Sequence, residues 1–415
     1  MNVWHPFTQE KTAKTPIKIT SGKGSYLYTA DDKKYLDAIS SWWVNLHGHA
    51  NQEIADAIYE QAKTLEHVIF AGFSHDPAYK LCSELQKLLP EELNRFFFSD
   101  NGSTAVEVSL KMAYQYFKNI GIENRNIFIN LEGGYHGDTL GAMSASGQTS
   151  IYHSTFAEFF FKTFSINIPE YYEGVENIEE KEEHSIEKLK DFLKSKGERV
   201  CALLIEPLVQ GAAGMRMYRE EFLNRICEEV RKYEILVIFD EVMTGFYRTG
   251  TTFAMNQTQI IPDFLCISKG ITGGFLPLSL TITTNKIYQA FLSDDWKKAF
   301  LHGHSYTANP IACAAALKSL EILQRPETQQ NINDLRDVHK LSMTNIKHFS
   351  KIRYKGTIAA FEVESSHIAK LIADKMFENG IIIRPINNII YIIPPYCTKI
   401  EDLKELYNTL LDKCC

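Results

Sequence analysis

The chain has 415 residues, of which 45% are hydrophobic and 12% aromatic, so it can bury a large core in one big domain with an appendage or in two domains. Its formal net charge of -7 comes from interspersed charges, which argues against a nucleic acid or an anionic membrane as the partner. We therefore expect small molecules as its ligands.

The N-terminus, "MNVWHPFTQEK", has no basic start followed by an apolar stretch, and no apolar run approaches the length that spans a bilayer. We expect a cytoplasmic protein. The 8 cysteines contain no C-x-x-C pair, which is typical of reduced thiols that act as small buried apolar groups. The sequence predicts no metal site and no structural disulfide.

Short apolar runs alternate with longer amphipathic stretches along the chain. "RFFFSD" predicts a strand, and the apolar residues after it have helical spacing: Val106, Leu110, Ala113 and Phe117. "CALLIEP", "ILVIFDE" and "DFLCISK" predict buried strands separated by helices. The highly charged segment 173–198 indicates a solvated loop and a surface helix. This alternation predicts the α/β class with a mainly parallel sheet.

The last third of the chain has a different pattern. After "HGHSYTANP", the Ala-rich stretch "IACAAALKSLEIL" predicts a helix. From Lys355 onward, short β-like runs such as "GIIIRP" and "NIIYIIPP" predict a smaller C-terminal α/β domain.

Two tryptophans and one arginine have side chains suited to binding a substrate. Trp42 and Trp43, in "SSWWVNLHGH", offer broad apolar walls for a long methylene chain. Arg384, in "IIIRP", supplies a planar donor fork for a terminal carboxylate. Core tryptophans and an exposed salt bridge would explain the same residues.

A glycine and serine loop follows the first predicted strand of the α/β pattern. The strand runs into Asn101, Gly102, Ser103 and Thr104 and then into the predicted helix. Backbone N–H groups and two hydroxyls would then converge at the positive end of a helix, which is typical of a phosphate cradle. Helix capping by Ser103 or Thr104 is the simpler interpretation, and the two are compatible.

The segment "NLEGGYHGDTLGAMSASG" places an aromatic ring after two glycines. The glycines allow a sharp turn that would free Tyr135 to stack on one face of a flat cofactor. His136 and Asp138 flank it. A buried tyrosine is more often a core residue, and a histidine beside it is more often a hydrogen-bonded structural residue.

Two acids follow apolar strands farther along the chain. Asp240, in "ILVIFDEVMTG", would lie at the carboxyl edge of the sheet, where a carboxylate can pair with the protonated ring nitrogen of a pyridine cofactor and keep the ring an electron sink. Val242 would pack on one face of that ring. Glu206, in "LIEPLVQG", is assigned to supporting hydrogen bonds. Acids at strand ends are also often helix caps or loop residues.

One lysine, Lys269, lies between an apolar run and a glycine cluster in "PDFLCISKGITGGFLP". It would lie at the carboxyl end of a strand, where open α/β folds bind their ligands. A partly desolvated amine loses its proton more easily, and a neutral amine can condense with an aldehyde. By itself, Lys269 is more readily explained as a surface lysine whose stem is buried.

Taken together, these segments resemble a known family. The order of the glycine and serine loop, "GYHGDT", "IEP", "DEV" and "SKG" is similar to that of the class III, pyridoxal-phosphate-dependent aminotransferases of fold type I, over nearly the whole chain. The resemblance implies a large cofactor-binding domain at 49–300 with a mainly parallel seven-stranded sheet. It also implies a smaller α/β domain built from both termini: 1–48 would join it, and 301–415 would supply an interface loop followed by the rest of it.

The resemblance also implies roles for single residues. Gly102 and Ser103 would bind the cofactor phosphate, Tyr135 would lie by the ring and touch the substrate, and Asp240 would contact the pyridine nitrogen. Lys269 would form the covalent bond to pyridoxal phosphate and carry the catalysis, with Asp240 and Tyr135.

Two further segments match the family. In "LHGHSYTANP", Gly303 would line the substrate site, while His304 and Ser305 would reach the phosphate bound by the partner subunit of a homodimer. Arg248, in "GFYRTG", matches a family arginine and is assigned to the architecture of the site.

Within the family, several segments are similar to the branch that aminates 7-keto-8-aminopelargonate in biotin biosynthesis: "WHPFTQ", "SSWWVNLHGH", "EGGYHGDT", "VQGAAGMRMY" and "IIIRP" with "IYIIPPY". This resemblance favours substrate-binding roles for Trp42 and Arg384, and a supporting one for Trp43. It also implies a reaction in two half-reactions at one pocket.

The amino donor is open at this point. Relatives that use S-adenosylmethionine commonly have a tyrosine and a proline where this chain has Phe7 and His304, and the forms "FTQ" and "HGHSYT" resemble relatives that use lysine. The paired tryptophans resemble the S-adenosylmethionine users. We expect S-adenosylmethionine, because a sulfonium and an adenine need aromatic faces. Alternatives are lysine, another ω-amino substrate, and a non-catalytic regulator, although no basic helix-turn-helix pattern is present.

Overall fold

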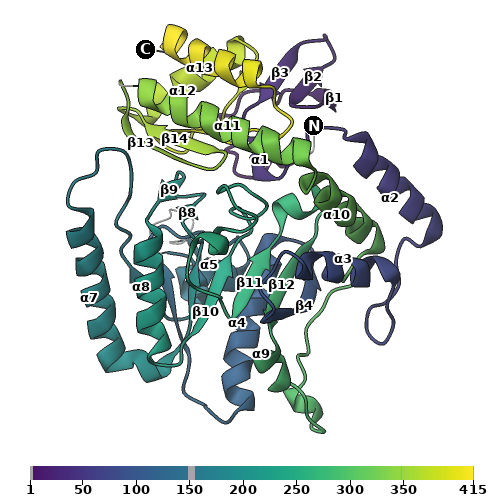
Figure 1. Ribbon diagram of the computed structural model, residues 1–415, viewed down its shortest axis with the longest axis vertical. Coiled ribbons are helices and arrows are strands. Elements are labelled where there is room, and N and C mark those ends of the chain that lie inside the picture. Colours follow the sequence, from purple (N-terminus) through teal and green to yellow (C-terminus); the bar gives the residue numbers. More distant parts are fainter. Residues whose placement is uncertain (1–2, 148–154, 347, 415) are drawn as a thin grey trace.

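Figure 1 shows the computed structural model of the protein, which describes residues 3–147, 155–346 and 348–414. A large sheet with helices on both faces occupies the lower part of the view. Strands and helices from both ends of the chain form a smaller assembly in the upper part.

The large sheet has seven strands in the order β4-β12-β11-β10-β7-β5-β6. Only β12 is antiparallel to its neighbours, and the other pairs are parallel. This confirms the predicted α/β class and the mainly parallel sheet. The strands are β4 (Leu93–Ser99), β5 (Ile127–Leu131), β6 (Thr163–Ile166), β7 (Val200–Ile205), β10 (Leu236–Asp240), β11 (Phe264–Ile267) and β12 (Ser279–Thr284).

Alternate side chains of each central strand point to opposite faces, and each face is covered by helices. On β10, Ile238 packs in the core formed with α4, whereas Val237 and Phe239 pack in the core formed with α8. The first face carries α4 (Gly102–Asn119), α5 (Leu140–Ala145) and α9 (Asn285–Gln289). The second carries α3 (Asp76–Gln86), α7 (Ile178–Lys196), α8 (Glu220–Arg231) and α10 (Pro310–Leu323).

Both ends of the chain contribute to the smaller assembly. β15 from the C-terminal part pairs in parallel with β3 from the N-terminal part, so that Ile381 is opposite Leu36. The domain boundaries after residues 48 and 300 stay predictions. This assembly contains β1 (Ile19–Lys23), β2 (Tyr26–Thr29), β3 (Lys34–Asp37), α11 (Pro326–Asn345), β13 (Ser350–Lys355), β14 (Ile358–Glu362), α12 (Ser366–Glu378), β15 (Ile381–Ile382), β16 (Ile389–Ile392) and α13 (Ile400–Cys414).

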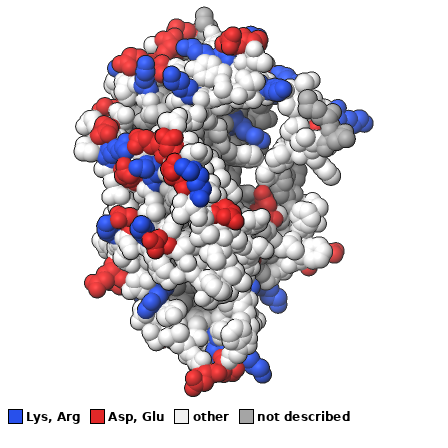
Figure 2. All heavy atoms as spheres, turned by 90° about the vertical axis from the view of Figure 1, so that its right-hand side faces the viewer, with Lys and Arg blue, Asp and Glu red and all other residues white. Residues whose placement is uncertain are grey.

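The remaining elements lie outside these sheets. They are α1 (Ser40–Trp43), α2 (Gln52–Thr64), β8 (Val209–Gln210), β9 (Arg216–Met217) and the 3₁₀ turns η1 (Ala157–Phe159), η2 (Gly197–Arg199), η3 (Ala254–Gln257), η4 (Lys269–Thr272) and η5 (Trp296–Lys298). In Figure 2, the side that carries α2, α3 and α10 faces the viewer; charges of both signs are mixed there, and broad areas carry none.

Within the described residues, no helix has the length and apolar content needed to cross a bilayer. The same residues contain no group of three His, Cys, Asp or Glu side chains that could hold a metal ion.

Candidate active site

Ser268 separates Lys269 from the carboxyl end of β11, and Lys269 begins the turn η4. It lines a cavity of about 680 Å³ at this edge of the sheet. Burial lowers the pKa of its amine, and the carboxylates of Asp240 and Glu206 oppose that shift. The Nζ atom lies 5.2 Å from the centroid of the Trp43 ring, which also lines the cavity. The cavity therefore contains an amine that is easier to deprotonate than an ordinary lysine.

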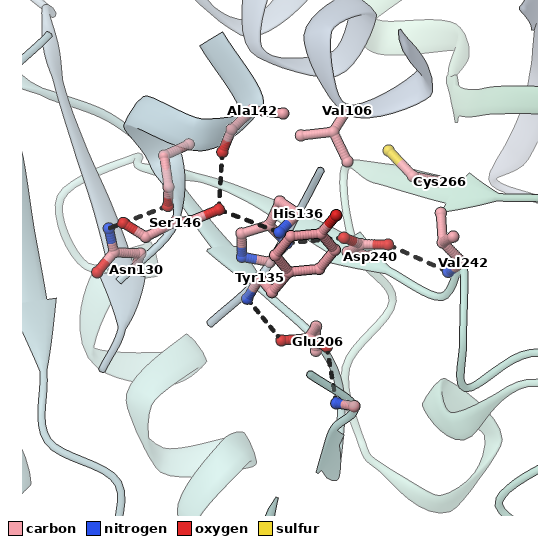
Figure 3. A network of polar contacts seen from close by, with 12 residues as sticks. Val106, Asn130, Tyr135, His136, Ala142, Ser146, Glu206, Asp240, Val242 and Cys266 are labelled. Carbon is pink, nitrogen blue, oxygen red and sulfur yellow. Dashed lines mark hydrogen bonds and ion pairs between the residues drawn. The ribbon is translucent and has the colours of Figure 1, made fainter. Parts of the chain in front are cut away.

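Asp240 ends β10 and is buried beside the cavity. Its Oδ2 lies 2.7 Å from Nδ1 of buried His136, and its Oδ1 accepts a hydrogen bond from the N–H of Val242 at 3.1 Å. The N–H of His136 donates to Ser146 Oγ, which donates to the carbonyl of Ala142 (Figure 3). These contacts fix the orientation of the carboxylate. The contact of His136 with Asp240 was missed by sequence reasoning, and its position beside Tyr135 was the only local signal.

Glu206 follows the end of β7 and connects two loops of the cavity wall (Figure 3). Its Oε2 accepts a hydrogen bond from the N–H of Tyr135 at 3.0 Å, and its Oε1 accepts one from the N–H of Gly211 at 3.0 Å. The expected supporting hydrogen bonds are confirmed. Burial raises the pKa of Glu206 to about 7, and its two backbone hydrogen bonds offset only part of that shift.

The loop before α4 forms one end of the cavity, where Gly102 and Ser103 line it. Ser103 Oγ lies 2.7 Å from Thr139 Oγ1 and accepts a hydrogen bond from the N–H of Thr139 at 3.1 Å. A Cβ on Gly137 would collide with Ser103 Oγ, so the two loops approach as closely as a glycine permits. The first N–H groups of a helix have no partner within it, so this end can accept an anion.

The cap of α4 differs from the sequence expectation. Asn101, not Ser103 or Thr104, is the N-cap residue: its side chain accepts a hydrogen bond from the N–H of Thr104 at 3.0 Å. Thr104 Oγ1 accepts one from the N–H of Asn101 in return. The hydroxyl of Thr104 is therefore used within the cap, and Thr139 supplies the second hydroxyl at the cavity. Sequence reasoning missed Thr139, which lies 36 residues beyond Ser103.

Two predicted ring neighbours line the same cavity. Val242 packs against the start of α4, since a Cβ on Gly102 would lie 2.5 Å from Val242 Cγ1. The Tyr135 hydroxyl donates a hydrogen bond to Asp138 Oδ2 at 3.0 Å. Burial raises the pKa of Tyr135 above its usual value, and Asp138 adds to the effect.

The two tryptophans have different environments. Trp43 is buried in the cavity wall. Trp42 is 37% exposed and is not part of that wall. The guanidinium of Arg384 lies 4.4 Å from the centroid of the Trp42 ring, and the Phe7 ring contacts the same indole edge-on at 5.5 Å. Arg384 and Trp42 thus form a cluster next to the cavity.

Gly303, His304 and Ser305 do not line the cavity of their own chain. Their predicted contact with a partner's phosphate stays a prediction. Arg248 is buried and donates to the carbonyls of Pro394 and Asn45 at 2.9 and 3.0 Å, which gives it an architectural role.

Similarity to known proteins covers nearly the entire chain. The family profile "Aminotransferase class-III" matches residues 7–413. The chain is 46% identical to the adenosylmethionine-8-amino-7-oxononanoate aminotransferase of Synechococcus elongatus, over 99% of this chain and 98% of that protein. It is 37% identical to the protein of the same name from Helicobacter pylori, over 99% and 95%.

Solved structures agree with this match. The crystal structure of the enzyme of that name from Methanocaldococcus jannaschii superposes with a TM-score of 0.90 at 33% identity, covering 99% of this chain and 97% of the other. An amine transaminase from an uncultivated Pseudomonas species, solved in its PLP-bound form, superposes with a TM-score of 0.91 at 28% identity, covering 99% and 98%. The chain therefore belongs to the class-III aminotransferase family.

Proposed function

We propose that the protein transfers an amino group to 8-amino-7-oxononanoate, also called 7-keto-8-aminopelargonate, in biotin biosynthesis. Class-III aminotransferases depend on pyridoxal 5′-phosphate. The observation that carries the proposal is the convergence of Lys269, Asp240 and the Ser103 loop on one cavity. The names of relatives that are 34–46% identical over almost the full chain support the acceptor.

The residues present fit pyridoxal phosphate. Gly102 and Ser103 at the start of α4, with Thr139, would hold the phosphate group, and the Asp240 carboxylate would hold the protonated ring nitrogen. Val242 and Tyr135 would lie on the two sides of the ring. The bound cofactor supplies an aldehyde that accepts the amino group and a ring that stabilises negative charge on carbon.

The side chains of this protein then have distinct tasks. Lys269 Nζ holds or releases a proton, and its lowered pKa raises the neutral fraction that can take a proton from the substrate carbon. Asp240, oriented by His136 Nδ1 and by the N–H of Val242, keeps a negative charge in place where a ring nitrogen would carry a positive one. Glu206 holds the backbone of Tyr135 and thereby the cavity wall.

Substrate recognition would use the tryptophans and Arg384. Trp43 offers an apolar wall beside Lys269 for the methylene chain, and Arg384, stacked on Trp42, offers a donor fork to the carboxylate. A second candidate function is amine transamination of another ω-amino substrate, which is favoured by the likeness to the Pseudomonas amine transaminase.

S-adenosylmethionine is the donor that we propose. The names of the relatives support it, as does the aromatic cluster of Phe7 and Trp42. Lysine is the competing donor, because Phe7 offers no hydroxyl and His304 stands where S-adenosylmethionine users commonly have proline.

The protein is further proposed to be a cytoplasmic homodimer with its active sites at the subunit interface. Exposed apolar side chains support an interface on the face that carries α2 and α3: Tyr59, Ile69, Phe73 and Tyr79. Large exposed apolar areas on a soluble chain commonly mark a contact surface. In such a dimer, Gly303, His304 and Ser305 would complete the partner's site.

A half-reaction assay tests the proposed function. S-adenosylmethionine is added to the yellow, cofactor-loaded protein without acceptor, and the visible absorbance band of the cofactor is followed. We expect the band to disappear and to return when 8-amino-7-oxononanoate is added. Loss of the band with lysine but not with S-adenosylmethionine would overturn the donor, and no return with the keto acid would overturn the acceptor.

The variant Lys269→Ala tests the role of the lysine. Turnover should fall by more than about 10³-fold, because both the nucleophile and the proton carrier are lost. Its thermal unfolding midpoint should stay close to that of the unmodified protein. Lys297→Ala, at an exposed lysine, is the matched control and should retain turnover. Wild-type turnover in Lys269→Ala would remove Lys269 from the reaction.

A further inference from the structure

Four successive residues between β3 and α2 adopt left-handed backbone conformations, although none is glycine. Their φ angles are +50° at Ser40, +45° at Ser41, +72° at Trp42 and +72° at Trp43. The N–H of Trp43 donates to the carbonyl of Ile39 at 2.9 Å, so the segment forms a turn of left-handed helix, α1. This conformation is unfavourable for each L-residue and persists only where its surroundings enforce it.

A buried carboxylate holds the start of this turn. Asp37 Oδ2 accepts a hydrogen bond from Ser41 Oγ at 2.7 Å and lies 2.9 Å from His49 Nε2. Asp37 Oδ1 accepts one from the N–H of Ile39 at 3.2 Å. Asp37 therefore connects the backbone before the turn, a side chain within it and a residue after it.

A buried arginine and a strand end hold the rest. Arg248 donates to the carbonyls of Trp43 and Asn45, at 3.4 and 3.0 Å, so its positive charge lies where the carbonyls of the turn point outward. Ser40 Oγ donates to the carbonyl of Ile393 at 2.7 Å. The turn is thus fixed both by the loop after β10, which carries Arg248, and by Ile393, which directly follows β16 in the smaller assembly.

The turn sends its two indoles to different places. Trp43 is 5% exposed, and its ring lies 5.2 Å from Lys269 Nζ and 6.0 Å from the ring of Tyr391. Trp42 points toward Arg384 and Phe7. If the turn became right-handed, both rings would move, because the handedness of a helix determines the direction in which each successive side chain points.

We propose that Asp37 and Ser41 are positioning residues for the keto acid. By holding α1 in its left-handed form, they keep the Trp43 wall beside Lys269 and the Trp42 ring under Arg384, so that the methylene chain and the carboxylate of one substrate are recognised at a fixed separation. This inference rests on the proposed function, and it concerns which residues select the substrate.

Two substitutions at one position separate backbone conformation from the lost hydroxyl. Ser41→Ala and Ser41→Gly both remove the hydrogen bond to Asp37, but glycine adopts a φ of +45° without the penalty that alanine has. We expect Ser41→Ala to raise the KM for 8-amino-7-oxononanoate about fivefold and Ser41→Gly to leave it within about twofold of wild type. The KM for the donor should rise in Ser41→Ala as well, because Trp42 is also proposed to contact S-adenosylmethionine. The thermal unfolding midpoint should change little in both variants.

Near-ultraviolet circular dichroism supplies a readout that needs no turnover. The chain has 4 tryptophans, and Trp4 and Trp296 are 88% and 74% exposed, so the ordered indole signal arises mainly from Trp42 and Trp43. Ser41→Ala should weaken this signal and Ser41→Gly should preserve it. Ala50→Gly, an exposed position at φ +52° outside the turn, is the control and should change neither measurement.

The possible outcomes are distinct. Equal effects of alanine and glycine at Ser41, whether both large or both absent, would overturn the proposal, because the backbone conformation would then not matter. A wild-type protein that fails to aminate 8-amino-7-oxononanoate would overturn the proposed function and the substrate role of the turn together. If the wild type aminates 8-amino-7-oxononanoate normally, but Ser41→Ala and Ser41→Gly have the same KM for it, only the positioning role would be overturned.

Discussion

At the scale of single residues, the site depends on buried charges that are oriented by hydrogen bonds. A carboxylate removed from water is costly unless its oxygens have partners. Asp240 has one partner for each oxygen, His136 Nδ1 and the N–H of Val242, so its orientation is determined before any ligand binds. Glu206 accepts hydrogen bonds from two backbone N–H groups, which lower its pKa, but burial outweighs them and raises the pKa to about 7.

The exposed guanidinium of Arg384 leads to the first prediction. Arg384→Ala should raise the KM for the keto acid about tenfold, equivalent to ~1.4 kcal/mol. This effect is smaller than that of breaking a fully buried charge pair, because Arg384 is exposed. Arg384→Lys should recover only part of this, because an ammonium keeps the charge but cannot stack on Trp42 as a plane. Steady-state kinetics with each substrate varied separately provides the measurement. If the KM for the keto acid stayed unchanged in Arg384→Ala, the residue would lie outside the substrate site.

At the scale of elements, the proposed phosphate site is a junction between the start of α4 and the loop after β5. Asn101 caps the helix, which leaves Ser103 Oγ free to contact Thr139. The close approach of the two loops depends on Gly137, whose φ is +125°. This junction depends more on backbone geometry than on any single side chain.

Gly137→Ala should therefore disrupt the junction. The added methyl would collide with Ser103, so we expect the affinity for pyridoxal phosphate to fall by about tenfold or more, as measured by titration of the apoprotein with the cofactor. Gly121→Ala is the matched control: its φ is +86°, and nothing lies within 4 Å of the position of its Cβ. It should lose about 1 kcal/mol of stability and no cofactor affinity. Equal affinities of the two variants would contradict the predicted site.

At the scale of the whole molecule, α11 packs against α13 in the smaller assembly. His339 on α11 is buried, and its Nδ1 lies 2.6 Å from the hydroxyl of Tyr407 on α13. Burial lowers the pKa of His339 from 6.5 to about 3. The folded protein therefore keeps this imidazole neutral in mild acid.

This depressed pKa sets the direction of a pH effect. Below about pH 6.5 the unfolded chain takes up a proton at His339 and the folded protein does not, so stability falls as the pH falls from about 6.5 toward 3. Between pH 7 and 4.5, we expect the wild type to lose roughly 2–3 kcal/mol more than His339→Gln, which does not titrate. Chemical denaturation at the two pH values measures both losses. Other titrating groups, such as Glu206, are common to both proteins, and parallel losses would show that His339 is not responsible.

The sequence was sufficient for features that depend on local pattern. Alternating apolar runs and amphipathic stretches predicted the strands around β10 and the helix α4, because burial on both faces of a parallel sheet and on one face of a helix leaves those periods in the chain. The positions of Lys269 and Asp240 after strands predicted that they would lie at one edge of the sheet, and both line the same cavity.

Other features were decided only by the tertiary structure. His136 orients Asp240, and Thr139 contacts Ser103, in both cases through side chains whose partners lie on another loop. The left-handed turn at Trp42 and Trp43 opposes the local preference of its residues, since its conformation is enforced by distant groups such as Arg248. Local periodicity thus determined the helices and strands and the sheet edge at which the site lies. Long-range contacts determined how the side chains of the site are oriented, because those contacts join residues that are far apart in the sequence and belong to no common periodic pattern.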